Sequence, residues 1–122
     1  MSGAARTPEE FFDGYPDGLA IYRRVTEMID GLGEAEVRVS KSQIAFRARR
    51  GFAHVWRPGR YVDNDVLVVL SIPLPAEHKS KRFKSVVHPS PKVWMHHLEI
   101  RDPDQVDDEV ARWLRDAYDA AS

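Results

Sequence analysis

Between Glu36 and Arg101 the chain consists largely of β-rich segments, and as far as Leu74 the connections between them are too short to hold a helical crossover. We predict strands at 36–39, 43–48, 52–57, 66–73 and 93–101. The turn-type segments Arg50-Gly51 and Asp63-Asn64-Asp65 separate successive strands. Because parallel neighbours would need a longer, usually helical, crossover, we expect a mostly antiparallel sheet of four to five strands.

Helical patterns flank this β-rich part of the chain. Thr7 is followed by Pro8 and, three residues after the cap, by Glu10, which predicts a short helix. Apolar residues at helical spacing predict a second helix over 17–32 and an amphipathic C-terminal helix that opens at Asp102-Pro103. At 122 residues, the chain is expected to form a single α+β domain over 1–122, with residues 1–6 disordered.

The connection over 75–92 is longer than most connections in compact domains. It carries several Lys and Arg residues and ends near Pro89 and Pro91. We expect one helical turn within it, over 80–87.

Several kinds of chemistry are excluded or disfavoured by the residues present. The chain has no cysteine, which excludes disulfides, thiol nucleophiles and cysteine-ligated metals. It has no phosphate-binding glycine loop and no nucleophile elbow. His96 and His97 are adjacent on a predicted strand, so their side chains should point to opposite faces. We therefore expect no metal, no cofactor and no catalytic residue.

The location of the protein is also a prediction. No window approaches the roughly 18 apolar residues of a membrane-spanning helix. The first ten residues lack an apolar core region and turn acidic. We expect a cytoplasmic protein that does not associate with membranes.

Charge is distributed unevenly along the chain. Residues 36–101 carry a net charge of +8, whereas residues 1–35 carry −4 and residues 102–122 carry −5. All five histidines lie in the basic part. Such asymmetry is typical of a surface that meets an anionic partner, and it is equally typical of basic and acidic elements that attract one another within one fold.

The register of the hairpin over 43–57 decides which side chains are available to a partner. A two-residue turn at Arg50-Gly51 would place apolar residues on one face and would gather cations and flat rings on the other: Arg47, Arg49, Phe52, His54 and Trp56. That face would suit base stacking and phosphate binding. We favour this register, because it separates the charged from the apolar residues.

Two alternatives remain open at this point. A three-residue turn would move Phe52, His54 and Trp56 into the core. In the favoured register, the two rings at 52 and 56 could still form a second small core beneath the 75–92 segment, because the strand over 66–72 is apolar on both faces.

A set of spaced residues carries a resemblance to a known family. They are Lys41, Ile44-Ala45-Phe46-Arg47, Phe52-Ala53, Val55, Pro58, Trp94, Leu114 and Ala117-Tyr118. The chain resembles an uncharacterised bacterial domain-of-unknown-function family, whose members are small free-standing actinobacterial proteins and C-terminal modules of predicted transport proteins. It is more distantly similar to YdhG-like domains. The resemblance implies a fold and leaves the function open. Where many members carry a glycine-containing turn after the tryptophan, this chain has Met95-His96-His97.

Three classes of function follow from these observations. The first, which we favour, is a non-enzymatic module whose basic sheet and loop bind nucleic acid or a small phosphate or carboxylate ligand. The second is a protein-interaction or homo-oligomerisation domain. The third is a small-ligand pocket or enzyme around His54, Trp94 and His96. The candidate ligand-binding residues are Lys41, Arg47, Arg49, Phe52, His54, Trp56, Arg57, Arg60, Lys81, Arg82, Lys84, Trp94 and His96.

Overall fold

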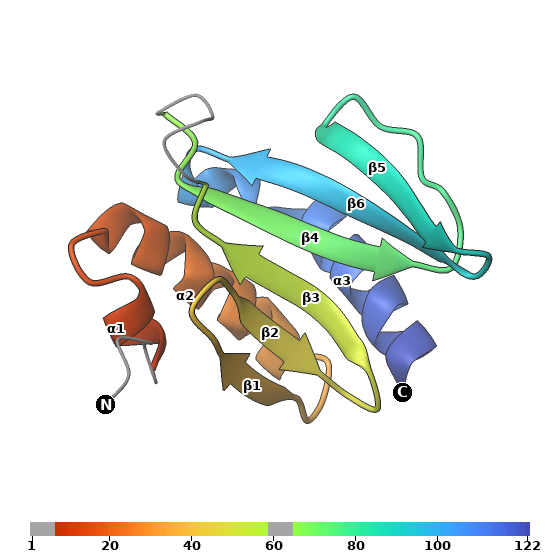
Figure 1. The fold of residues 1–122 in the computed structure, drawn as a ribbon, viewed down its shortest axis with the longest axis horizontal. Coiled ribbons are helices and arrows are strands. Elements are labelled where there is room, and N and C mark those ends of the chain that lie inside the picture. The colour runs from red at the N-terminus through yellow and green to blue at the C-terminus, as the bar shows by residue number, and fades with distance from the viewer. Residues whose placement is uncertain (1–6, 59–64) are drawn as a thin grey trace.

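The computed structural model describes residues 7–58 and 65–122, so the predicted disorder of residues 1–6 lies outside the described part. Two N-terminal helices come first, and strands and a final helix follow (Figure 1). The elements are α1 (Pro8–Phe11), α2 (Pro16–Asp30), β1 (Glu36–Val39), β2 (Ile44–Arg47), β3 (Gly51–Trp56), β4 (Val68–Leu74), β5 (Phe83–Ser90), β6 (Val93–Ile100), the 3-10 turn η1 (Pro103–Gln105) and α3 (Asp108–Ala121).

The strands form one sheet in the order β1-β2-β3-β4-β6-β5, and every neighbouring pair is antiparallel. The expected α+β fold with an antiparallel sheet is therefore confirmed. The expected number of four to five strands is wrong, because the described part of the chain forms six.

The strand absent from the prediction is β5, which replaces the helical turn expected over 80–87. It lies at the edge of the sheet and pairs with β6. Most of its side chains are exposed, so it shows little of the apolar alternation by which a strand is recognised. Its anchor is Phe83, whose ring lies 4.5 Å from that of Trp113 and 4.7 Å from that of His96.

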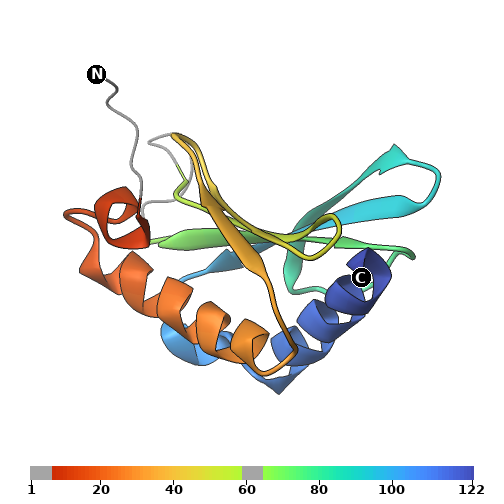
Figure 2. The same ribbon diagram turned by 90° about the horizontal axis from the view of Figure 1, so that it is seen from below.

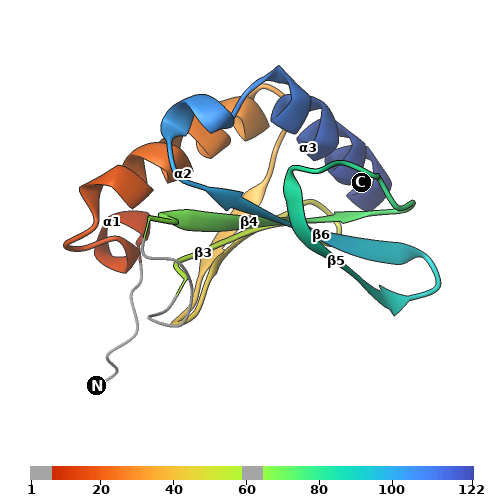
Figure 3. The ribbon, with the colours of Figure 1, turned by 90° about the horizontal axis from the view of Figure 1, so that it is seen from above.

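Both long helices pack on the same face of the sheet (Figures 2 and 3). α3 contacts β3 and β4, and α2 contacts α3 and β4. The buried helix positions include Ile21 and Val25 of α2 and Val110 and Leu114 of α3, which recur at helical spacing. The core therefore lies between one sheet face and these two helices, and the opposite face, toward the viewer in Figure 1, carries no helix.

The C-terminal helical region begins where the sequence predicts, but it has two parts. Asp102 caps η1 through the backbone N–H of Asp104, and Asp107 caps α3 through the backbone N–H of Val110. Each aspartate satisfies backbone donors that have no partner within the helix. Two successive capping residues thus divide what the sequence predicts as one helix.

A β-bulge in the β2–β3 hairpin changes the predicted register. Ile44 pairs with Val55 and Phe46 with Ala53, and the register then shifts so that Arg47 pairs with Gly51. A two-residue turn at Arg50-Gly51 would have paired Arg47 with His54, so the favoured register is wrong in detail. Ile44, Phe46, Ala53 and Val55 are nevertheless all buried in the main core, as the favoured faces require.

The expectation that Phe52 shares the face without helices is also wrong. Its side chain has 0% exposure, and its ring packs edge-on against Tyr118 of α3, 5.1 Å away. A bulge places one extra residue on one strand and breaks the strict alternation of side chains. Phe52 consequently belongs to the main core with Phe46, whose ring lies 6.5 Å away.

None of the described helices combines the length and the apolar character that crossing a bilayer requires.

Candidate functional site

The sheet face without helices carries a line of three hydrogen-bonded side chains. Trp56 of β3 donates from Nε1 to Ser71 Oγ of β4 at 3.0 Å. The same oxygen lies 2.7 Å from Nδ1 of His97 on β6. An indole can only donate, so the hydroxyl accepts from Trp56 and is free to donate its own proton to His97. Ser71 is 3% exposed, so this line stabilises the sheet surface and offers no accessible nucleophile.

Burial favours the neutral form of two histidines on this face. It lowers the pKa of His97 below the usual imidazole range, which agrees with Nδ1 accepting from Ser71. It also lowers the pKa of His54, and the positive charge of Arg47 adds to that effect. His54 Nδ1 is buried and has no hydrogen-bond partner.

His96 and Trp94 do not join His54 in one site. His96 is fully buried, accepts from the backbone N–H of His78 at 2.9 Å and contacts the carbonyl of Trp94 through Nδ1. Trp94 stacks on His88, with the ring centroids 3.8 Å apart. His96 pairs with Ile72 on the sheet, whereas His54 pairs with the adjacent Ser71, so the two imidazoles leave opposite faces. The predicted three-residue arrangement is therefore not formed.

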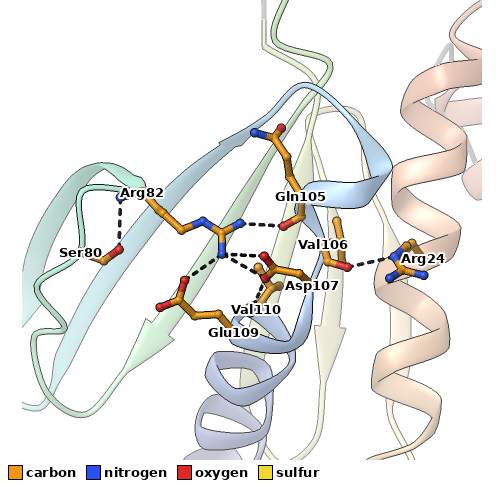
Figure 4. A network of polar contacts seen from close by, with 8 residues as sticks. All are labelled: Arg24, Ser80, Arg82, Gln105, Val106, Asp107, Glu109 and Val110. Carbon is orange, nitrogen blue, oxygen red and sulfur yellow. Dashed lines mark hydrogen bonds and ion pairs between the residues drawn. The ribbon is translucent and has the colours of Figure 1, made fainter.

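Arg82 is held by acidic residues at the start of α3 (Figure 4). Its Nη1 donates to Asp107 Oδ1 at 3.0 Å and to Glu109 Oε1 at 2.9 Å, and its Nη2 donates to the carbonyl of Gln105 at 2.7 Å. Partial burial would raise the pKa of Asp107, but the hydrogen bonds from Arg82 and from the Val110 backbone lower it overall. This candidate residue links the basic and the acidic parts of the chain.

Other candidate cations also face carboxylates. Arg47 Nε lies 3.9 Å from Glu36 Oε1, and Arg38 Nε lies 3.0 Å from the same oxygen. A shallow depression of about 800 Å³ places Arg47 and Arg49 near Glu36 and other acids of the adjoining loop and helix. Carboxylates therefore interrupt the positive charge around Arg47 and Arg49, whereas a nucleic-acid platform relies on continuous positive charge.

A cavity of about 690 Å³ lies where the start of α2 meets the end of β3, and three candidate residues line it: Lys41, Trp56 and Arg57. We call it the Arg57 cavity. Its apolar lining includes Phe11, Tyr15, Pro16, Pro58, Val66 and Leu67, and its polar lining also includes Ser42 and Asp17.

Arg57 contacts two aromatic rings and forms an ion pair with no carboxylate of the described residues. Its Cζ lies 4.4 Å from the centroid of Tyr15 and 5.2 Å from that of Phe11. These cation–π contacts position the guanidinium without using its N–H groups as donors, and those groups make no hydrogen bond to a described residue. Nε is buried and has no hydrogen-bond partner. The cavity thus contains a positioned cation that lacks an acceptor.

The start of α2 adds a weaker positive contribution. Pro16 occupies the first turn, and Tyr15 at the N-cap makes no side-chain capping hydrogen bond. The N-terminal backbone N–H groups of a helix carry a partial positive charge. Asp17, in the same turn, is the carboxylate that balances it.

The remaining candidate residues are dispersed. Arg47 and His54 line a second cavity beside the β2–β3 turn, and Lys81 lines a shallow depression near β5. Lys84 is exposed on β5, and Arg60 lies outside the described residues. Within the part of the chain that the structure describes, no group of three His, Asp or Glu side chains could hold a metal ion.

Sequence reasoning did not identify Phe11 and Tyr15 as parts of a site. The segment Gly14-Tyr15-Pro16 reads only as an interruption between two helices. One sequence feature could have pointed to this site. Tyr15 stands at the N-cap of α2, where a tyrosine cannot cap the helix as Ser, Thr, Asp or Asn would, so the N-terminal backbone N–H groups are left for another partner.

The comparison with protein families accounts for nearly the whole chain. Residues 9–121 match the model of a domain of unknown function, DUF5655. The chain belongs to the DUF5655 family. No significant match to this DUF5655 chain was found among curated proteins or solved structures. The match spans most of the chain, and the family it identifies has no known function.

Proposed function

We propose that this DUF5655 domain is a non-enzymatic module that binds a small carboxylate with an aromatic or apolar body in the Arg57 cavity. The observation that carries the proposal is the guanidinium of Arg57, which is stacked on two rings while its buried Nε lacks an acceptor. A carboxylate could accept from the two terminal nitrogens of Arg57 together, in the paired geometry that arginine favours.

The charge of the cavity supports a monoanion. Lys41 and Arg57 contribute two positive charges, and Asp17 contributes one negative charge. Neither cation makes a hydrogen bond or an ion pair with a described side chain. A ligand with one negative charge would bring the described lining to neutrality.

The apolar lining supports a ligand body that is flat or hydrophobic. Trp56 lines the cavity, and its indole nitrogen is already bonded to Ser71, so its ring rather than its N–H is available there. Val66 and Leu67 add aliphatic surface. Ligand sites commonly combine such an apolar lining with a few orienting polar groups.

A nucleic-acid partner is less well supported than a small ligand. Phe52 is buried, Arg82 is held by Asp107 and Glu109, and Arg47 faces Glu36. These residues were expected to stack bases and hold phosphates. In this structure Phe52 and Arg82 make contacts within the fold, and Arg47 lies close to a surface carboxylate.

The proposal is tested by an NMR titration of the isotope-labelled protein with 2-naphthoate. We expect saturable shifts at the indole N–H of Trp56 and at the Gly18 amide, and weaker effects from the neutral analogue 2-naphthalenemethanol. Arg57→Met retains an adaptable apolar side chain against the rings and removes the charge. It should weaken 2-naphthoate binding about tenfold or more, because charged hydrogen bonds contribute about 1.5–3 kcal/mol.

The matched control is Lys84→Met, which removes an exposed cation far from the cavity lining. It should leave the affinity unchanged. Equal affinities of the wild type and Arg57→Met for 2-naphthoate, or equal binding of the neutral analogue, would contradict the proposal.

Other expectations go beyond this site and stay predictions. They are the distant similarity to YdhG-like domains, the relation to predicted transport proteins, the cytoplasmic location and homo-oligomerisation. Sedimentation at several protein concentrations tests the last of these, since self-association would raise the average mass with concentration.

A further inference from the structure

A second cavity, separate from the Arg57 cavity, lies beside the turn of the β2–β3 hairpin. Its volume is about 440 Å³. Its walls come from that turn, the end of β4, the start of β6 and the last turns of α3. We call it the hairpin cavity. No residue lines both cavities, so a ligand in one would leave the other open.

The charges around the hairpin cavity all have one sign. Arg47, Arg50 and Lys92 line it, and no Asp or Glu is among its described lining residues. Three cations that share one small space repel one another, and the repulsion is relieved when an anion enters.

Of these three cations, only Arg50 makes a hydrogen bond to another described residue. Arg50 donates from Nη2 to the carbonyl of Ala120, and this contact serves the C-terminal end of α3. Among the described residues, Arg47 has one carboxylate within 4 Å, that of Glu36, whose Oε1 lies 3.9 Å from Nε. Lys92 is exposed in the turn before β6 and makes no hydrogen bond or ion pair with another described residue.

His54 supplies a fourth polar group to the hairpin cavity. Its imidazole packs against Gly51, where an added Cβ would lie 3.1 Å from Cε1 and 3.4 Å from Nε2. Its Nδ1 is buried without a partner. The tautomer with the hydrogen on Nε2 avoids a buried N–H that lacks an acceptor, and it leaves one donor on the ring.

The rest of the lining is apolar and comes from Pro73, Met95 and Ala117, among others. We infer that the hairpin cavity binds the dianionic phosphate of a small phosphate ester, with Arg47, Lys92 and His54 as donors and the ester group against this apolar wall. A dianion suits the hairpin cavity better than a carboxylate does, because its lining has no negative charge to offset the cations.

The test is an NMR titration with phenyl phosphate at constant ionic strength, with inorganic phosphate as the second probe. Saturable shifts are expected at the His54 ring and at the Gly51 amide, with tighter binding of phenyl phosphate than of inorganic phosphate. The double variant Arg47→Gln/Lys92→Gln should weaken binding of phenyl phosphate at least tenfold, or about 1.4 kcal/mol.

Two further variants keep the test decisive. Lys92→Gln alone changes an exposed turn residue and should weaken binding without altering the fold. Lys81→Gln changes an exposed cation outside the hairpin cavity and should have no effect. Shifts that do not saturate, or saturable shifts that persist in both the double and the Lys92→Gln variants, would overturn the inference.

The result does not depend on the proposed function. Arg57→Met should leave binding of phenyl phosphate at His54 unchanged, and the double variant should leave the 2-naphthoate shifts at Trp56 unchanged. Failure of one site is therefore distinguishable from failure of the other.

Discussion

The indole nitrogen of Trp56 donates a 3.0 Å hydrogen bond to the hydroxyl of Ser71 across neighbouring strands. This bond orients the ring that lines the Arg57 cavity and satisfies a serine that is 3% exposed. It also explains why Trp56, on the face without helices, is neither a core residue nor a freely exposed stacking residue. Part of its ring covers the sheet, and part is available to a ligand.

The bond between Trp56 and Ser71 should be measurable in a double-mutant cycle. Trp56→Phe removes the donor, Ser71→Ala removes the acceptor, and we expect a coupling free energy of about 0.5–1.5 kcal/mol. Urea unfolding of the wild type, both single variants and the double variant gives this value. Fully additive effects would show that the bond does not form in solution.

Arg82 should contribute more to stability than its basic neighbours do. Arg82→Met removes the bonds to Asp107, Glu109 and the Gln105 carbonyl and leaves an apolar side chain near Trp113. We expect the free energy of unfolding to fall by about 1–3 kcal/mol, with solvent screening placing it toward the lower end.

The control for Arg82 is Lys81→Met, at the preceding exposed residue, which should change stability by no more than about 0.5 kcal/mol. Chemical denaturation with urea measures both variants. Equal effects of the two substitutions would show that the contacts in Figure 4 add nothing to stability.

Alanine substitutions at two glycines with positive φ should distinguish the cost of backbone strain from the cost of a steric clash. Gly14 has φ +81° and no atom within 4 Å of an added Cβ, whereas at Gly33, with φ +151°, the Cβ would lie 3.1 Å from Tyr118 Cζ and closer still to its hydroxyl oxygen. Gly14→Ala should cost about 1–2 kcal/mol from the backbone alone.

Gly33→Ala should cost more than Gly14→Ala, because it also displaces the ring whose hydroxyl donates to the carbonyl of Glu34. Thermal unfolding of the two variants makes the comparison. A smaller loss of stability for Gly33→Ala would mean that the Tyr118 ring moves aside freely.

Stability should decrease between neutral and mildly acidic pH. Burial holds the pKa of His54, His96 and His97 below the ordinary imidazole range in the folded state. Below about pH 6.5 the unfolded chain therefore takes up protons that the folded chain does not. This contribution is fully present above that pH and is lost as the pH falls toward the folded-state pKa values.

Urea unfolding at about pH 7.5 and about pH 5.5 tests the sign of this dependence. His97→Gln keeps a group that can accept from Ser71 but cannot titrate, and it should reduce the difference between the two pH values. A protein that is as stable or more stable at the lower pH would contradict the expectation.

The sequence by itself determined the elements whose signals are local. The capping box of Thr7 and Glu10, the helical spacing in 17–32 and the short connections between β-rich segments all act between near neighbours. They were sufficient to predict an α+β fold with an antiparallel sheet and an amphipathic C-terminal helix. The uneven charge distribution had two possible explanations, an anionic partner or attraction between basic and acidic elements of the fold. The ion pairs of Arg82 with Asp107 and Glu109 are an example of the second.

Only the tertiary structure decided the features that depend on contacts between distant residues. The bulge turns Phe52 toward the helices, where its ring packs edge-on against the ring of Tyr118 in α3. β5 forms because Phe83 packs on Trp113 and β6 supplies backbone partners to an otherwise polar segment. Arg57 meets Tyr15 only when the end of β3 lies against the start of α2. Local preferences do not specify such contacts, because each depends on which competing arrangement buries more surface and leaves fewer polar groups unpaired.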